Sequence, residues 1–140
     1  MTGCRPPELP ASATVLNYDR SMYDAPVVLI ITGILLGIIQ WRAASSGARR
    51  SGAAGIRLPS TLASDEAWRA GHRAAAKHMR LAAAAFIAGG IAALIFRTSS
   101  LQEDTLMVAT GVGVLFLIRA AVVANRHAYL TNAFSRRKDL

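Results

Sequence analysis

The sequence has one cysteine, few aromatic side chains and few acidic residues. Each of these shortages excludes some classes of protein. Cys4 has no second cysteine to pair with, so an internal disulfide is excluded and we interpret Cys4 as a free thiol. Aromatic residues make up 6% of the 140 residues, whereas hydrophobic residues make up 53% and are gathered into blocks. Apolar blocks of this kind are typical of a chain that is solvated by lipid.

Acidic residues are outnumbered by basic ones, eight to sixteen, which gives a formal net charge of +8. Such an excess fits either nucleic acid or anionic lipid as a partner. The basic residues lie between the apolar blocks and no nucleic-acid-binding motif accompanies them, so we expect membrane lipids with anionic headgroups and no direct binding of nucleic acid.

The sequence shows none of the patterns that carry common enzyme chemistry. There is no Gly-rich phosphate loop, no nucleophile beside a base, and no pair of carboxylates within an apolar block. His72 and His78 are six residues apart, roughly on opposite faces of a helix, and no further ligand joins them. We therefore expect a protein that is not an enzyme and that holds no cofactor or metal.

Three apolar blocks predict an all-α polytopic membrane protein with three transmembrane helices, over residues 22–41, 81–96 and 106–124. Twenty helical residues span ~30 Å, which matches the hydrocarbon core of a bilayer. Tyr23 and Trp41 flank the first block, where aromatic rings prefer the interface. A cleaved signal peptide is the competing interpretation of this block, but the positive segment that should precede it is missing. Arg119 lies near the end of the third block, and we expect its guanidinium to reach the headgroups.

The segments between the blocks predict the orientation. Residues 42–80 carry eight basic residues and the tail 125–140 carries four, whereas the arm 1–21 and the connection 97–105 are poor in them. By the positive-inside rule, the arm and the connection are exterior, and the loop and the tail are cytoplasmic. We expect Pro6, Pro7 and Pro10 to leave the arm mostly irregular. The prediction is an N-out, C-in protein, most simply of a bacterial plasma membrane.

Small residues recur four apart in all three apolar blocks, as in the pairs Gly33 with Gly37, Ala85 with Gly89, and Ala109 with Gly113. This spacing lets helix backbones approach closely in a membrane. We expect helix packing, either within the chain or in a homo-oligomer, at five glycines: Gly33, Gly37, Gly89, Gly111 and Gly113.

The cytoplasmic loop contains the features of a helix that continues into the second span. Ser64 is a good N-cap, Asp65 and Glu66 lie in the first turn, and no proline occurs before Phe96. Two interpretations remain open for its surface. It is either an interfacial helix, with Trp68 at headgroup level and cations on anionic lipid, or a recognition surface made of Arg57, Glu66, Trp68, His72 and Arg73.

The run GIRLPSTLASDEAWRAGHR, residues 55–73, resembles the cytoplasmic motif of the SdpI family. Leu58 stands where the motif usually has threonine. The positions that match are Gly55, Ile56, Arg57, Pro59, Thr61, Leu62, Ser64, Glu66, Trp68, His72 and Arg73. We take all of them except Ile56 as the motif or partner-binding residues. The resemblance implies a minimal three-span membrane protein that provides immunity to a membrane-active toxin, or signals through the motif loop, with a toxin or regulator as partner. The alternative is an accessory subunit of a larger membrane complex, which would use its glycine faces.

Overall fold

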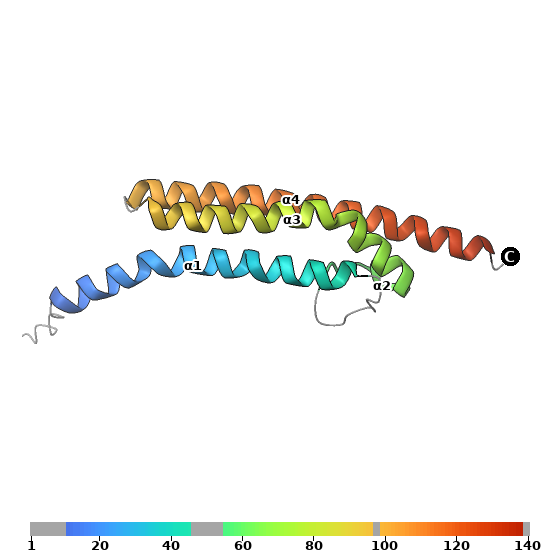
Figure 1. Cartoon of the computed structure of the whole chain (residues 1–140), viewed down its shortest axis with the longest axis horizontal. Helices are drawn as coiled ribbons and strands as arrows, with labels where there is room; N and C mark the ends of the chain where they lie inside the picture. Colours follow the sequence, from blue (N-terminus) through green and yellow to red (C-terminus); the bar gives the residue numbers. More distant parts are fainter. Residues whose placement is uncertain (1–10, 46–54, 97–98, 139–140) are drawn as a thin grey trace, which may run out of the picture.

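A computed structural model of the protein describes residues 11–45, 55–96 and 99–138, and within these ranges it contains helices and no strand. The helices are α1 (Ala11–Ala44), the short α2 (Pro59–Leu62), α3 (Asp65–Ile95) and α4 (Ser99–Lys138). Figure 1 shows α3 and α4 running side by side, α1 on the other side of α3, and α2 at the end of the bundle where α3 begins. The all-α prediction is confirmed.

Three of these helices are long and apolar enough to cross a membrane, over Tyr23–Ala44, Asp65–Ile95 and Ser100–Ser135. This confirms the prediction of three transmembrane helices. With 31 and 40 residues, α3 and α4 are about 46 and 60 Å long, whereas a hydrocarbon core is only about 30 Å thick. Both helices therefore extend beyond the membrane. The N-out, C-in orientation stays a prediction from the distribution of positive charge.

The helices are longer than the apolar blocks that predicted them. Residues 11–21 belong to α1, so the expectation of an irregular arm is wrong for this part. No proline occurs between Pro10 and Pro26, and a formed helix propagates easily through such a segment. For the same reason α4 already begins at Ser99, within the expected exterior connection, and continues through most of the expected tail to Lys138.

Close contact between α1 and α3 depends on glycine. A Cβ atom on Gly33 would lie 2.7 Å from Cγ1 of Ile87 and 2.8 Å from the carbonyl oxygen of Ala83. Gly90, which the spacing did not single out, is equally close to the carbonyl oxygen of Pro26. In both places a backbone lies where a side chain would have to go, so a larger residue would push the two helices apart.

The contact between α3 and α4 uses two more of the predicted glycines. A Cβ atom on Gly89 would overlap the methyl group of Ala109, and one on Gly113 would overlap the ring of Phe86. Gly37 and Gly111 differ, because nothing lies within 4 Å of the position that their Cβ atoms would take. These two glycines do not mediate packing within the described part of the chain.

Candidate functional site: the motif platform

The motif residues 55–73 fold into a structure that joins the ends of α1, α3 and α4, and we call it the motif platform. It begins at Gly55, whose φ of +104° is a conformation that residues with a side chain rarely adopt. A Cβ atom on Gly55 would also lie 2.7 Å from Nε2 of His72 and 2.9 Å from the ring of Trp68. Glycine is therefore required here both for the turn and for the close approach.

His72 is at the centre of the motif platform and is completely buried. Its Nε2 lies 2.9 Å from the backbone nitrogen of Ile56, and its Nδ1 lies 2.9 Å from the carbonyl oxygen of Trp68. The Ile56 N–H can only donate, so Nε2 must be the unprotonated nitrogen and Nδ1–H must donate to Trp68. The imidazole is neutral with both nitrogens satisfied, and it acts as a structural bridge.

Trp68 packs against this imidazole one helical turn earlier on α3. The two ring centroids are 4.1 Å apart with an angle of 32° between the ring planes, and Trp68 is 1% exposed. Stacking of this kind adds to the free energy that the buried ring area contributes. The interpretation that Trp68 lies at the lipid headgroups is therefore wrong, because the protein itself encloses the indole.

Gln40 connects the motif platform to α1. Its Nε2 donates to the carbonyl oxygen of His72 over 2.8 Å, and Gln40 is only 3% exposed. Because a buried amide would be costly without a partner, this bond fixes the end of α1 against α3. Two residues that are 32 positions apart in the sequence are thereby held together.

The start of the motif platform is held by Thr61, which is fully buried in α2. Its hydroxyl accepts from the Leu58 N–H over 3.0 Å. The same hydroxyl lies 2.9 Å from the carbonyl oxygens of Ile56 and Leu58, which share its single O–H as acceptors. Pro59 occupies the first helical position, where its fixed φ suits a helix start, and Leu62 is half-buried. The turns of residues 56–61 are thus stabilised by hydrogen bonds within this short segment.

Two asparagines of α4 bind the motif platform from the side. Ser60 donates to Oδ1 of Asn125 over 2.5 Å, and Nδ2 of Asn132 donates to the Ser60 carbonyl oxygen over 2.9 Å. The Ser64 hydroxyl lies 3.3 Å from Oδ1 of Asn132 and caps α3 by accepting from the Ala67 N–H over 3.0 Å. The part of α4 beyond the third predicted span therefore serves as the support of the motif.

Three charged residues of the motif remain on the outside. Arg57, Glu66 and Arg73 are exposed, and within the described residues no ion pair joins Glu66 to either arginine. Glu66 and Arg73 are seven residues apart on α3 and so lie on one face, separated by about 10 Å. The predicted site is therefore divided into buried side chains, of which His72 and Thr61 bond to the backbone of the motif, and three exposed charges that form no ion pair with each other.

The sequence of this region also matches a known family. The sequence profile of the SdpI/YfhL protein family matches residues 47–124, which is more than half of the chain. The chain belongs to the SdpI/YfhL family. No curated protein and no solved structure matches it.

Three residues of the motif platform were not predicted from the sequence and lie outside the range that the family profile matches: Gln40, Asn125 and Asn132. A signal for the asparagines exists, since they are seven residues apart on one helix with the fully buried Ala128 between them. Ala120, Ala124 and Ala128 continue this small face every four residues, and all three are buried. Gln40 gives no such signal, because a single glutamine beside Trp41 is equally typical of a membrane interface. Among the described residues no group of three or more His, Cys, Asp or Glu side chains could hold a metal ion.

Proposed function

We propose that this SdpI/YfhL protein is a non-enzymatic immunity or signalling protein of a bacterial plasma membrane, and that it binds a protein partner through the exposed charges of the motif platform. The observation that carries the proposal is the division of the motif. Thr61, Trp68 and His72 are buried, Gly55 is half-buried, and these four hold the fold together, whereas Arg57, Glu66 and Arg73 face outwards.

Folding gives a reason for the buried motif residues but none for these three charges. An exposed arginine that does not pair within the protein adds little to its stability. Its planar guanidinium is, however, well suited to bind a carboxylate with two parallel hydrogen bonds. A rigid support that presents two arginines and one glutamate fits the recognition of a partner with a complementary charge pattern.

The test is survival of a bacterium that expresses the protein and is challenged with a panel of secreted membrane-permeabilising peptides. We expect the wild type to protect, and Arg57→Lys, Arg73→Lys and Glu66→Gln to lose protection at equal abundance in the membrane. Lysine keeps the charge of arginine but not its fork. The control is Arg137→Lys, at an exposed position near the end of α4. Equal protection by all four variants would contradict the proposal.

A role as accessory subunit of a membrane complex is the second proposal, and the open glycines favour it. Gly111 is exposed on α4, and no described atom of another helix lies within 4 Å of the position that its Cβ atom would take, in contrast to Gly113. Small residues on an unoccupied face allow another membrane helix to approach closely. If this face binds a subunit, Gly111→Leu should abolish co-migration with a larger complex in native gels and leave the protein folded. Unchanged co-migration would contradict this role.

A further inference from the structure

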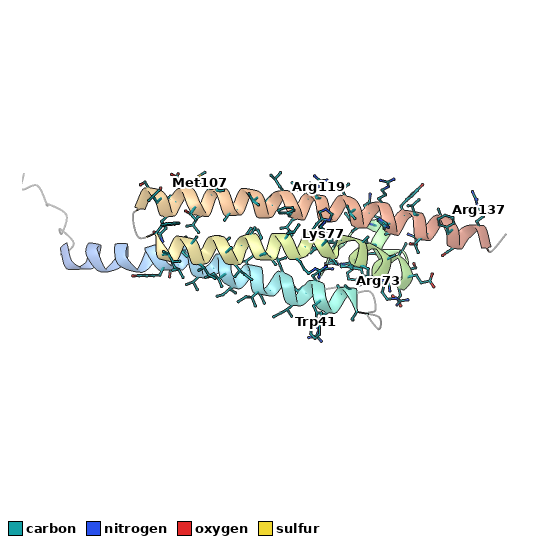
Figure 2. All side chains as sticks on the ribbon, turned by 45° about the horizontal axis from the view of Figure 1, so that its top comes forward. Trp41, Arg73, Lys77, Met107, Arg119 and Arg137 are labelled. Atoms are coloured by element: carbon teal, nitrogen blue, oxygen red, sulfur yellow. The ribbon has the colours of Figure 1, made fainter. Side chains whose placement is uncertain are left out.

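Three exposed side chains from three different helices lie at one level of the bundle. Figure 2 shows Trp41 of α1, Lys77 of α3 and Arg119 of α4 at the same position along the long axis. Packing contacts agree, because the buried cluster at this level, with the residues packed against it, combines all three helices: Leu36, Ala75, Met79, Leu117, Ala120 and Ala124. Trp41 is 77% exposed, which suits an indole at a membrane interface.

The exposed face of α3 changes its character at this level. Arg73, Lys77 and Arg80 precede the change and are exposed, whereas Leu81 and Ile91 follow it and are exposed as well. Nε of Arg80 lies 3.4 Å from the carbonyl oxygen of Ala76, so the side chain points towards the beginning of α3 and away from the apolar half. This is how an arginine at the edge of a hydrocarbon layer places its charge in the headgroups.

No acidic side chain in the described part of the chain lies at this level. Asp24, Glu103 and Asp104 belong to the opposite end of the bundle, and Asp65 and Glu66 lie at the start of α3, about 17 Å beyond Lys77. At the level of Lys77 and Arg119, the described residues therefore provide no negative charge that could neutralise the basic side chains. An anion from outside the protein would have to supply it.

We infer that a cation belt, defined as Arg42, Lys77, Arg80 and Arg119, binds the phosphate groups of anionic phospholipids. Free phosphate fits this surface less well, because the belt borders exposed apolar side chains such as Ile38 and Leu81 that acyl chains would cover. Binding at the belt fixes the depth of the protein, so that the motif platform stands in the aqueous phase. This inference does not depend on the function proposed above.

Two arginines of α4 provide a matched test. Arg119 and Arg137 are both exposed and are 18 residues apart, which is five helical turns, so they share a face but lie about 27 Å apart along the axis. Only Arg119 belongs to the belt. The experiment is native mass spectrometry of the full-length protein in mild detergent, with phosphatidylglycerol and phosphatidylcholine of identical acyl chains supplied in equal amounts.

We expect the wild type to retain phosphatidylglycerol in preference to phosphatidylcholine. Arg119→Gln and Lys77→Gln should each lower this preference by about fivefold, the effect of one cation near an anionic surface. Arg119→Lys and Arg137→Gln should behave like the wild type. Three results would overturn the inference: equal retention of both lipids, a loss in Arg137→Gln as large as in Arg119→Gln, or displacement of phosphatidylglycerol by millimolar inorganic phosphate. The last would assign the belt to a free anion.

Discussion

The apolar half of the bundle and the motif platform are held together by different means. In the apolar half, helices meet where glycine allows a backbone to touch its neighbour, as at Gly33 and Gly89. In the motif platform, the contacts are hydrogen bonds of buried polar groups, with His72, Gln40 and Thr61 at the centre. The same helix, α3, takes part in both.

This difference follows from the solvent of each half. Between helices in lipid there is no gain from removing apolar surface from water, so close approach and dispersion must provide the stability. In the motif platform, the cost of taking polar groups out of water is offset where they find partners, as the side chains of His72 and Thr61 do. Among the described residues, Gln40 Oε1 and Trp68 Nε1 are buried without such a partner. The apolar half therefore depends on small residues at the helix contacts. The motif platform depends instead on correctly placed hydrogen-bond donors and acceptors.

The largest effect is expected from Gly33→Leu in the apolar half. The new side chain would start 2.8 Å from the carbonyl oxygen of Ala83, which cannot move without displacing α3. We expect a loss of stability at or above the about 1–3 kcal/mol that overpacking usually costs. Thermal unfolding in detergent, followed by helical circular dichroism, measures it. Gly37→Leu is the control, since Gly37 has open space beside it; equal melting temperatures of the two variants would refute the account of helix packing.

A smaller but still large effect is expected from Gly55→Ala in the motif platform. Alanine at φ +104° is strained, and its Cβ atom would displace His72 or Trp68. A loss of about 1–3 kcal/mol corresponds to an increase of roughly 5- to 150-fold in amide exchange at Ile56, whose N–H is bonded to His72. Exchange near Ile87 in the apolar half should not change. Faster exchange in both halves would show that they do not unfold separately.

The smallest effect is expected from Asn132→Ala, which removes the bond to the Ser60 carbonyl oxygen and the contact with Ser64. One such hydrogen bond contributes about 0.5–1.5 kcal/mol. Amide exchange in residues 56–62, compared with the wild type, measures the change. Thr131→Ala is the matched control, because within the described part of the chain the Thr131 hydroxyl bonds only to the His127 carbonyl oxygen of its own helix. If Thr131→Ala loosened residues 56–62 as much, the support by α4 would be disproved.

Local patterns predicted much of the fold. Three apolar blocks, the N-cap at Ser64 and the absence of proline from residue 65 to residue 96 predicted the spans and the whole of α3. Gly33, Gly89 and Gly113 were also placed by their spacing. The spacing could not distinguish Gly37 and Gly111 from them, because it does not reveal which glycines of a helix face a neighbouring helix.

The architecture of the site was less accessible from the sequence. The motif identified Trp68 and His72, but a stripe of these residues with Ala75 and Met79 suits a lipid interface as well as a protein core. Whether this stripe belongs to a lipid interface or to a protein core depends on Gln40, Asn125 and Asn132, which come from two other helices. The spacing of Asn125 and Asn132 places them on one face of α4, but neither this spacing nor the single Gln40 indicates which distant residue each side chain will contact.

The protonation of His72 tests the central claim most directly, because one ring bridges the motif and α3 through both nitrogens. In the 15N-labelled protein in detergent at neutral pH, long-range nitrogen–proton correlation spectra distinguish the two ring nitrogens. The motif platform requires a neutral His72 with the proton on Nδ1 and an unprotonated Nε2 that accepts from the Ile56 N–H. A proton on Nε2, in either the neutral or the charged ring, would contradict it.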